Sequence, residues 1–171
     1  MRILLLIASH VAVAVAGFMA GIFALPILMA PDAPSVEAVV AAQGEALYSG
    51  EFRRDLEDSD FLHWGEGVIS VGPESIALMG RIAPGPAYRL YLSPEFVETE
   101  ARFEALKPLM VQVGPVDTFE NFIVPVSEDI DLEAYNTVII WCESFSQFIT
   151  AARYRCCLLY TSDAADDSVL V

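Results

Sequence analysis

The sequence is poor in basic side chains. Its 171 residues include nine Lys and Arg against 24 Asp and Glu, which gives a formal net charge of −15. A protein that binds nucleic acid neutralises phosphates with a basic surface, and docking on anionic lipid headgroups has the same requirement. The composition therefore excludes nucleic acid as a default partner, and the acidic surface is expected to keep an exported domain soluble.

The motifs of the familiar enzyme classes are also missing. The sequence holds no G-x-S-x-G elbow, no glycine-rich phosphate loop, no H-E-x-x-H and no C-x-x-C. The acidic run at residues 55–58 lacks the spacing and the glycine of an EF-hand loop. The sequence thus predicts no metal site and no known enzyme class, and it leaves open an electron-transfer or thiol-redox protein.

What the chain has in excess is an N-terminal apolar run. No charged residue lies between Ile3 and Ala30, and only Ser9 and His10 are polar. This exceeds the roughly 20 residues that a helix needs to cross a bilayer, and also the apolar core of about 7–15 residues that is typical of a cleaved signal peptide. We predict a signal anchor at residues 1–30, with cleavage as the alternative.

The charges flanking this run predict its orientation. Arg2 precedes it, and the segment that follows carries only the acids Asp32 and Glu37. The positive-inside rule then places the N-terminus in the cytoplasm. We expect a single-pass protein of the inner or plasma membrane whose domain lies in the periplasm or outside the cell.

Cysteine is scarce, with three in the chain. Cys156 and Cys157 open a tail in which LLYTSDAADD resembles a translated sequencing adapter, so we interpret residues 156–171 as an artefact. Cys142 then stands alone, and a lone thiol in an oxidising compartment forms no internal disulfide. It is either buried and inert, paired with another chain, or redox-active.

Between anchor and tail, the chain divides into a Pro/Ala-rich linker at residues 31–46 and a domain at residues 47–155. Short apolar runs with turn residues between them are typical of a β-sandwich or barrel. We expect an all-β domain of about eight strands, drawn from runs at residues 47–53, 61–64, 68–71, 75–79, 87–92, 110–113, 119–126, 137–142 and 145–150.

One helix is expected within this domain, at residues 94–107. Ser93 suits the N-cap and Pro94 the first helical position. Phe103 and Leu106 recur at helical spacing, and Pro108 ends the run. We expect this short amphipathic helix to cover the sheet.

The strand at residues 137–142 ends on the strongest candidate for chemistry. Thiols react as thiolates, and Cys142 stands beside Trp141, which could relay electrons or pack in the core. Glu143 and Ser144 begin a turn, which favours partial exposure of the sulfur. The competing interpretation is a buried structural cysteine, because free cysteine is among the most buried residue types.

His63 is the only histidine outside the apolar run. It is a candidate acid/base partner of Cys142. The two residues could also bind haem iron or copper, with a methionine such as Met79 or Met110 as a soft ligand. A hydrogen-bonded structural histidine is the alternative, and the cofactor stays unknown.

Several motifs are spaced across residues 47–155 in a recognisable order. They are Gly50-x-Phe52, His63 followed by Gly67-Val68, Pro84-Gly85-Pro86 before Tyr91-Leu92-Ser93, Val113-Gly114, Phe119-x-x-Phe122-x-x-Pro125, and Tyr135 leading to Val138-Ile139-Ile140-Trp141-Cys142-x-x-Phe145. This pattern resembles the DM-thirteen domain family, described as electron-transfer domains, in a single-domain, membrane-anchored bacterial form. The resemblance implies a β fold and a redox role centred on Cys142.

Two functions therefore remain open. The first is a membrane-anchored, exported domain that passes electrons to, or exchanges thiols with, a partner protein through Cys142. The second is an exported interaction module of the cell envelope, in which Cys142 belongs to the core and the acidic surface binds another protein. The accessibility of the Cys142 sulfur distinguishes the two.

Overall fold

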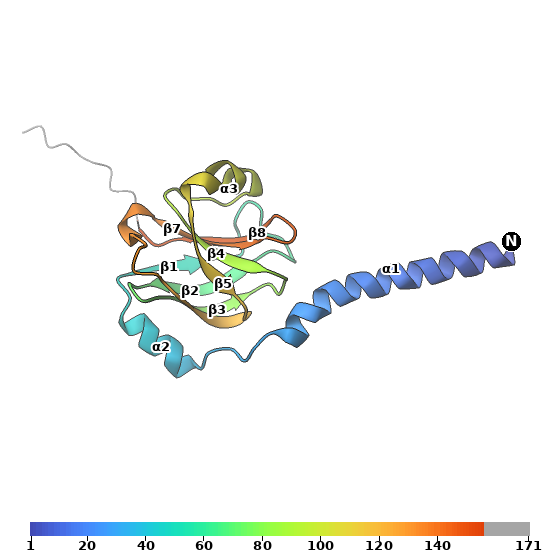
Figure 1. The fold of residues 1–171 in the computed structure, drawn as a ribbon, viewed down its shortest axis with the longest axis horizontal. Helices are drawn as coiled ribbons and strands as arrows, with labels where there is room; N and C mark the ends of the chain where they lie inside the picture. The colour runs from blue at the N-terminus through green and yellow to red at the C-terminus, as the bar shows by residue number, and fades with distance from the viewer. Residues whose placement is uncertain (156–171) are drawn as a thin grey trace, which may run out of the picture.

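The domain is a sandwich of two antiparallel four-stranded sheets (Figure 1). The structure is a computed structural model and describes residues 1–155. The first sheet has the order β1-β2-β3-β6, with β1 at Tyr48–Phe52, β2 at Gly65–Val71, β3 at Ser75–Ile82 and β6 at Glu120–Pro125. The second has the order β5-β4-β7-β8, with β5 at Val111–Val116, β4 at Tyr88–Ser93, β7 at Thr137–Cys142 and β8 at Gln147–Arg153. The all-β sandwich with one short helix in the domain is confirmed.

Strand β7 is buried along its whole length. It lies between β4 and β8, and all of its side chains are buried. Val138, Ile140 and Cys142 face the core between the sheets. The alternate residues Ile139 and Trp141 face a second cluster on the outer side of this sheet. Because both faces are covered, β7 appears in the sequence as a continuous apolar run rather than an alternating one.

The helix of the domain begins later than expected. Helix α3 spans Glu100–Leu106, and the Thr99 hydroxyl caps it by accepting a hydrogen bond from the Arg102 amide at 3.2 Å. Ser93 is instead the buried last residue of β4, and its hydroxyl donates to the Glu95 carbonyl at 2.7 Å. The chain bends at Pro94 and Glu95 before the helix begins, and the predicted start of the helix was wrong by six residues.

A 3₁₀ turn follows the helix. This turn, η1, spans Lys107–Leu109, so Pro108 lies inside it and the helical backbone continues past the expected stop. Phe103 and Leu106 are buried against the second sheet, as the helical spacing indicated.

Two expected strands also differ from the structure. Residues 61–63 form bends, because one carboxylate oxygen of Asp60 accepts hydrogen bonds from the Leu62 and His63 amides, both at 2.7 Å. Such side-chain contacts compete with strand pairing. The pairing instead starts at Gly65, three residues before the expected strand at residues 68–71. The last strand begins at Gln147 rather than Phe145, whose side chain is 53% exposed in the β7–β8 turn.

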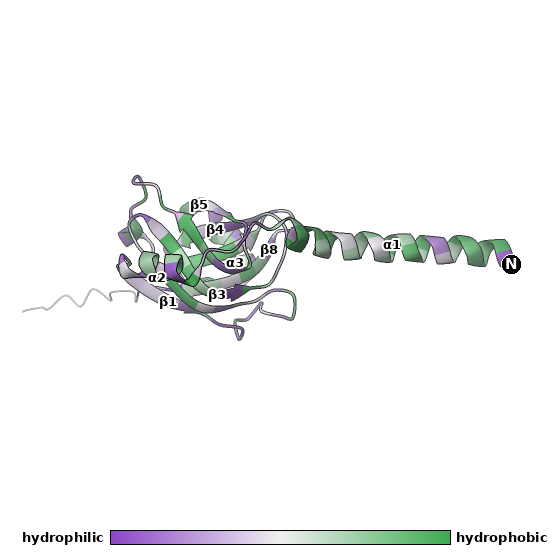
Figure 2. Cartoon of the chain, turned by 90° about the horizontal axis from the view of Figure 1, so that it is seen from below, coloured by the Kyte–Doolittle hydropathy of each residue, from purple (hydrophilic) through white to green (hydrophobic). Residues whose placement is uncertain are grey.

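Two helices precede the sandwich. Helix α1, Arg2–Met29, projects away from the domain and is apolar along most of its length (Figures 1 and 2). It is long and apolar enough to cross a membrane, a property that a signal sequence shares. Helix α2, Val36–Gly44, lies in the segment expected as a linker. It packs on β3 and β6, and the Val39 side chain is fully buried.

Candidate functional site

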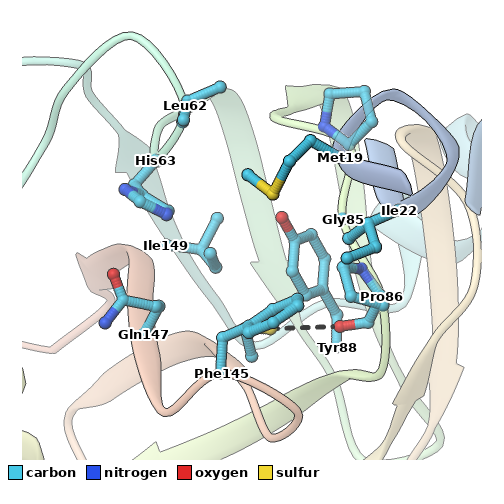
Figure 3. Close-up of a pocket in the computed structure, with 12 residues that line it drawn as sticks. Met19, Ile22, Leu62, His63, Gly85, Pro86, Tyr88, Phe145, Gln147 and Ile149 are labelled. Atoms are coloured by element: carbon cyan, nitrogen blue, oxygen red, sulfur yellow. Dashed lines mark hydrogen bonds between the residues drawn. The ribbon is translucent and has the colours of Figure 1, made fainter. Parts of the chain in front are cut away.

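A pocket of about 410 Å³ lies at the end of the sandwich where β7 stops and β4 begins. Its walls come from residues 84–88, from the β7–β8 turn, from Leu62 and His63, and from Met19 and Ile22 of α1 (Figure 3). The lining is predominantly apolar. Concave apolar sites with few polar groups are typical of small-molecule binding.

Cys142 lines this pocket but exposes only 2% of its surface. Its position at the end of β7 agrees with the sequence prediction, whereas the expected partial exposure was wrong. The sulfur donates a hydrogen bond to the Pro86 carbonyl at 3.2 Å (Figure 3). The side chain is covered because it points between the sheets and residues 84–88 fold over the end of the strand.

The surroundings of the sulfur favour a neutral thiol. Burial raises the pKa of Cys142, and the Glu143 carboxylate adds to that effect. The backbone amides of Phe145 and Ser144 act in the opposite direction, because they donate to the sulfur and favour the thiolate. Burial dominates, so the thiol is the main form at neutral pH.

His63 lines the same pocket, on the wall opposite Pro86 (Figure 3). Its Nδ1 lies 3.1 Å from the Asp60 carboxylate. Within residues 1–155, no hydrogen bond joins His63 to Cys142. The structure thus brings the two predicted site residues to one cavity without direct contact.

Within residues 1–155, the pocket offers no ligand set for a metal ion held by protein side chains alone. Met79 lies in β3 and Met110 packs near α3, so neither expected methionine reaches the pocket, and Met19 is the one that does. Across residues 1–155, no group of three His, Cys, Asp or Glu side chains could hold an ion. The Cys142 sulfur and the His63 Nδ1 each bond to a protein oxygen, and an imidazole bonded to a carboxylate through one nitrogen can still bind haem iron through the other.

Tyr88 is the pocket residue that sequence reasoning missed. It lies directly opposite Cys142 in the β4–β7 pairing and is 3% exposed. Its hydroxyl points into the pocket (Figure 3), and within residues 1–155 no hydrogen bond joins this hydroxyl to another residue. Burial raises its pKa, and the nearby Cys142 adds to that. The sequence shows only a tyrosine at the start of a predicted strand, with no signal of an unpartnered hydroxyl.

Neither tryptophan lines this pocket. Trp141 stacks on Phe103 with ring centroids 3.9 Å apart, on the other face of the sheet. The Arg54 guanidinium carbon lies over the Trp64 ring, 3.4 Å from the ring centroid. Packing is therefore the role that the structure shows for both rings.

Comparison with known proteins supports the resemblance inferred from the motifs. The family model described as Electron transfer DM13 matches residues 55–154, which include His63, Tyr88 and Cys142. The same comparisons found no match among curated proteins or solved structures. With more than half of its length matched across the sandwich, the chain belongs to the electron-transfer DM13 family.

Proposed function

We propose that this protein is a membrane-anchored, exported electron-transfer domain in which the Cys142 thiol is the redox group. The observation that carries the proposal is the position of Cys142. It is the one cysteine of residues 1–155, and it lines an apolar pocket of about 410 Å³ beside α1. The description of the family as electron-transfer proteins supports the same role.

Thiol exchange with a disulfide of a partner protein is the chemistry that a single thiol can perform. The Cys142 thiolate attacks one sulfur of the partner disulfide, forms a mixed disulfide, and releases the other sulfur as a thiolate. The proton lost by Cys142 balances the one taken up by the departing thiolate. The Ser144 and Phe145 amides favour the thiolate form, whereas burial of the sulfur slows the attack at neutral pH.

The length of α1 suggests where the pocket lies relative to the bilayer. Its 28 residues extend for about 42 Å, more than the hydrocarbon core of about 30 Å. With Arg2 at the cytoplasmic boundary, Met19 and Ile22 reach the outer boundary after about 26–30 Å of rise. The proposed anchor then holds the pocket at the outer membrane surface, with the domain in the periplasm or outside the cell.

The second candidate is a non-catalytic interaction module of the envelope. The observation in its favour is the 2% exposure of Cys142 together with its hydrogen bond to Pro86. In this role the sulfur packs as part of the core, and the acidic surface of the domain binds another protein.

Labelling of Cys142 with methyl methanethiosulfonate, a small neutral reagent, separates the two functions. The full chain is used in detergent, with Cys156 and Cys157 replaced by Ser, and modification is followed by mass spectrometry from pH 7 to pH 10. A redox thiol reacts in the folded protein faster than the protein unfolds, and the rate rises with pH because the thiolate reacts. Cys142→Ala is the unlabelled control. Reaction only after addition of denaturant supports the interaction module.

A further inference from the structure

We propose that the pocket beside Cys142 binds the ring of a quinone-class molecule from the bilayer, with the Tyr88 hydroxyl donating a hydrogen bond to one quinone carbonyl. The inference rests on the proposed electron-transfer function, because quinones are apolar redox carriers. It concerns binding alone and assigns no electron-transfer step to the bound molecule.

The unpartnered Tyr88 hydroxyl is the observation that calls for a ligand. The residue is 3% exposed, and its hydroxyl oxygen faces the pocket rather than being fully enclosed by protein. In a predominantly apolar cavity, a hydroxyl that has no protein partner can bond only to water or to a ligand. Other buried tyrosines of the domain are satisfied: Tyr154 donates to the Leu132 carbonyl at 2.9 Å, and Tyr91 bonds to Gln112 at 3.0 Å. A ligand with an acceptor oxygen would supply the hydrogen-bond partner that the Tyr88 hydroxyl lacks.

The ring packing of Tyr88 fixes the direction of this hydroxyl. The Phe119 and Tyr88 rings meet edge to face, with their centroids 6.0 Å apart. Gly85 lies so close that a Cβ on it would be 2.2 Å from the Tyr88 hydroxyl oxygen. One side of the hydroxyl therefore lies against Gly85. Its other side faces the cavity, where Met19 lies nearby (Figure 3).

The remaining lining suits a planar apolar ring. Phe145, Ile149 and Pro86 present hydrocarbon surface, and the His63 imidazole forms part of another wall (Figure 3). No lysine or arginine lines the pocket, so a carboxylate or phosphate has no counter-charge there. A ligand that combines an aromatic ring with carbonyl oxygens matches both the apolar walls and the single hydroxyl donor.

Helix α1 supplies the route of entry. Met19 and Ile22 form part of the pocket wall and belong to the helix that we propose as the anchor. Beside this helix the pocket opens at the level of the bilayer surface. A lipid-soluble ligand can therefore enter sideways from the membrane, with its tail left among the acyl chains.

The test measures binding of a decyl-substituted 1,4-benzoquinone to the full chain in phosphatidylcholine nanodiscs. The melting temperature of each variant is measured at increasing quinone mole fraction. The rise above that variant's own ligand-free melting temperature gives an apparent Kd. We expect Tyr88→Phe to raise the Kd about tenfold, the effect of losing one hydrogen bond. Tyr154→Phe, which removes a buried hydroxyl at the other end of the sandwich, should leave the Kd unchanged within about twofold.

Two further probes identify the chemistry that is recognised. Decylbenzene, which lacks the carbonyls, should bind more weakly than the quinone and equally to wild type and Tyr88→Phe. Methyl decanoate offers a carbonyl without a ring and should also bind more weakly. Equal quinone affinity in wild type and Tyr88→Phe would overturn the inference, and so would methyl decanoate binding as tightly as the quinone.

Failure of this inference can be told apart from failure of the proposed function. If the folded wild type reacts with methyl methanethiosulfonate at Cys142 but does not bind the quinone, the redox proposal stands and the quinone site is wrong. If the quinone binds while Cys142 reacts only in denaturant, the site stands as a binding site and the thiol proposal is wrong.

Discussion

Trp141 and Cys142 are consecutive in β7, yet their side chains lie in different clusters on opposite faces of the second sheet. Cys142 belongs to the core between the sheets, whereas Trp141 stacks on Phe103 of α3 at 3.9 Å. The alternation of side chains along a strand separates the two. One side of β7 therefore reaches the pocket, and the other holds the helix in place.

Phe103→Ala should destabilise the domain by about 3–5 kcal/mol, the usual cost of deleting a large buried aromatic side chain. The ring is fully buried and fills the space between Trp141 and Tyr91. Urea denaturation measures the change. Phe145→Ala is the matched control, because this ring is 53% exposed and its loss should cost less than about 0.5 kcal/mol. Similar costs for the two variants would show that α3 contributes little to the fold.

Stability should fall at alkaline pH because of Cys142 and Tyr88. Burial raises the pKa of both groups, so the unfolded chain releases these protons at lower pH than the folded chain. The contribution of the two groups to the free energy of unfolding is fully present below their ordinary pKa values of about 8.5 and 10. It is lost as the pH rises toward their pKa values in the folded protein. Urea denaturation at several pH values measures this slope.

The double variant Cys142→Ala, Tyr88→Phe should have a shallower slope above about pH 9 than the wild type. Some slope should remain, since burial also raises the pKa of Tyr91 and of Tyr154. Identical slopes in the two proteins would mean that the two groups titrate alike in the folded and unfolded states.

Gly80→Ala should destabilise the first sheet by about 1–3 kcal/mol or more, because overpacking against backbone cannot relax easily. A Cβ at this position would lie 2.1 Å from the Glu66 carbonyl oxygen, beside the paired Gly67. Gly44→Ala in α2 is the control, since nothing lies within 4 Å of a Cβ there. Thermal melting should show a large loss for the first variant and none for the second.

A chain ending at Arg155 should fold and melt like the full chain. The reason is that residues 156–171 lack the apolar alternation of the preceding strands. They lie outside the described residues, so their interpretation as an adapter artefact stays a prediction. A clearly lower melting temperature for the shortened chain would restore Cys156 and Cys157 as candidates for chemistry.

The sequence alone determined an all-β domain of the sandwich or barrel type, because its strand signals are local, and the packing of two separate sheets was decided by the tertiary structure. Short apolar runs between Gly, Pro and Asp turns predicted the strands, and the unbroken run at residues 138–142 predicted a central one. The errors arose where one side chain redirected the backbone: Asp60 caps a bend in place of a strand, and Thr99 in place of Ser93 starts α3. Hydrogen bonds of this kind depend on which donors the folded chain brings within reach.

The sequence predicted only part of the candidate site. The motifs pointed to His63 and Cys142, and the structure brings them to one pocket. The burial of the sulfur, the engagement of His63 by Asp60 and the unpartnered hydroxyl of Tyr88 were decided by the tertiary structure. A residue's type and spacing fix the strand face on which it lies. Its solvent exposure and hydrogen-bond partners depend on segments far apart in the chain, here residues 60–63, 84–88 and 142–149, which meet only after the two sheets have packed.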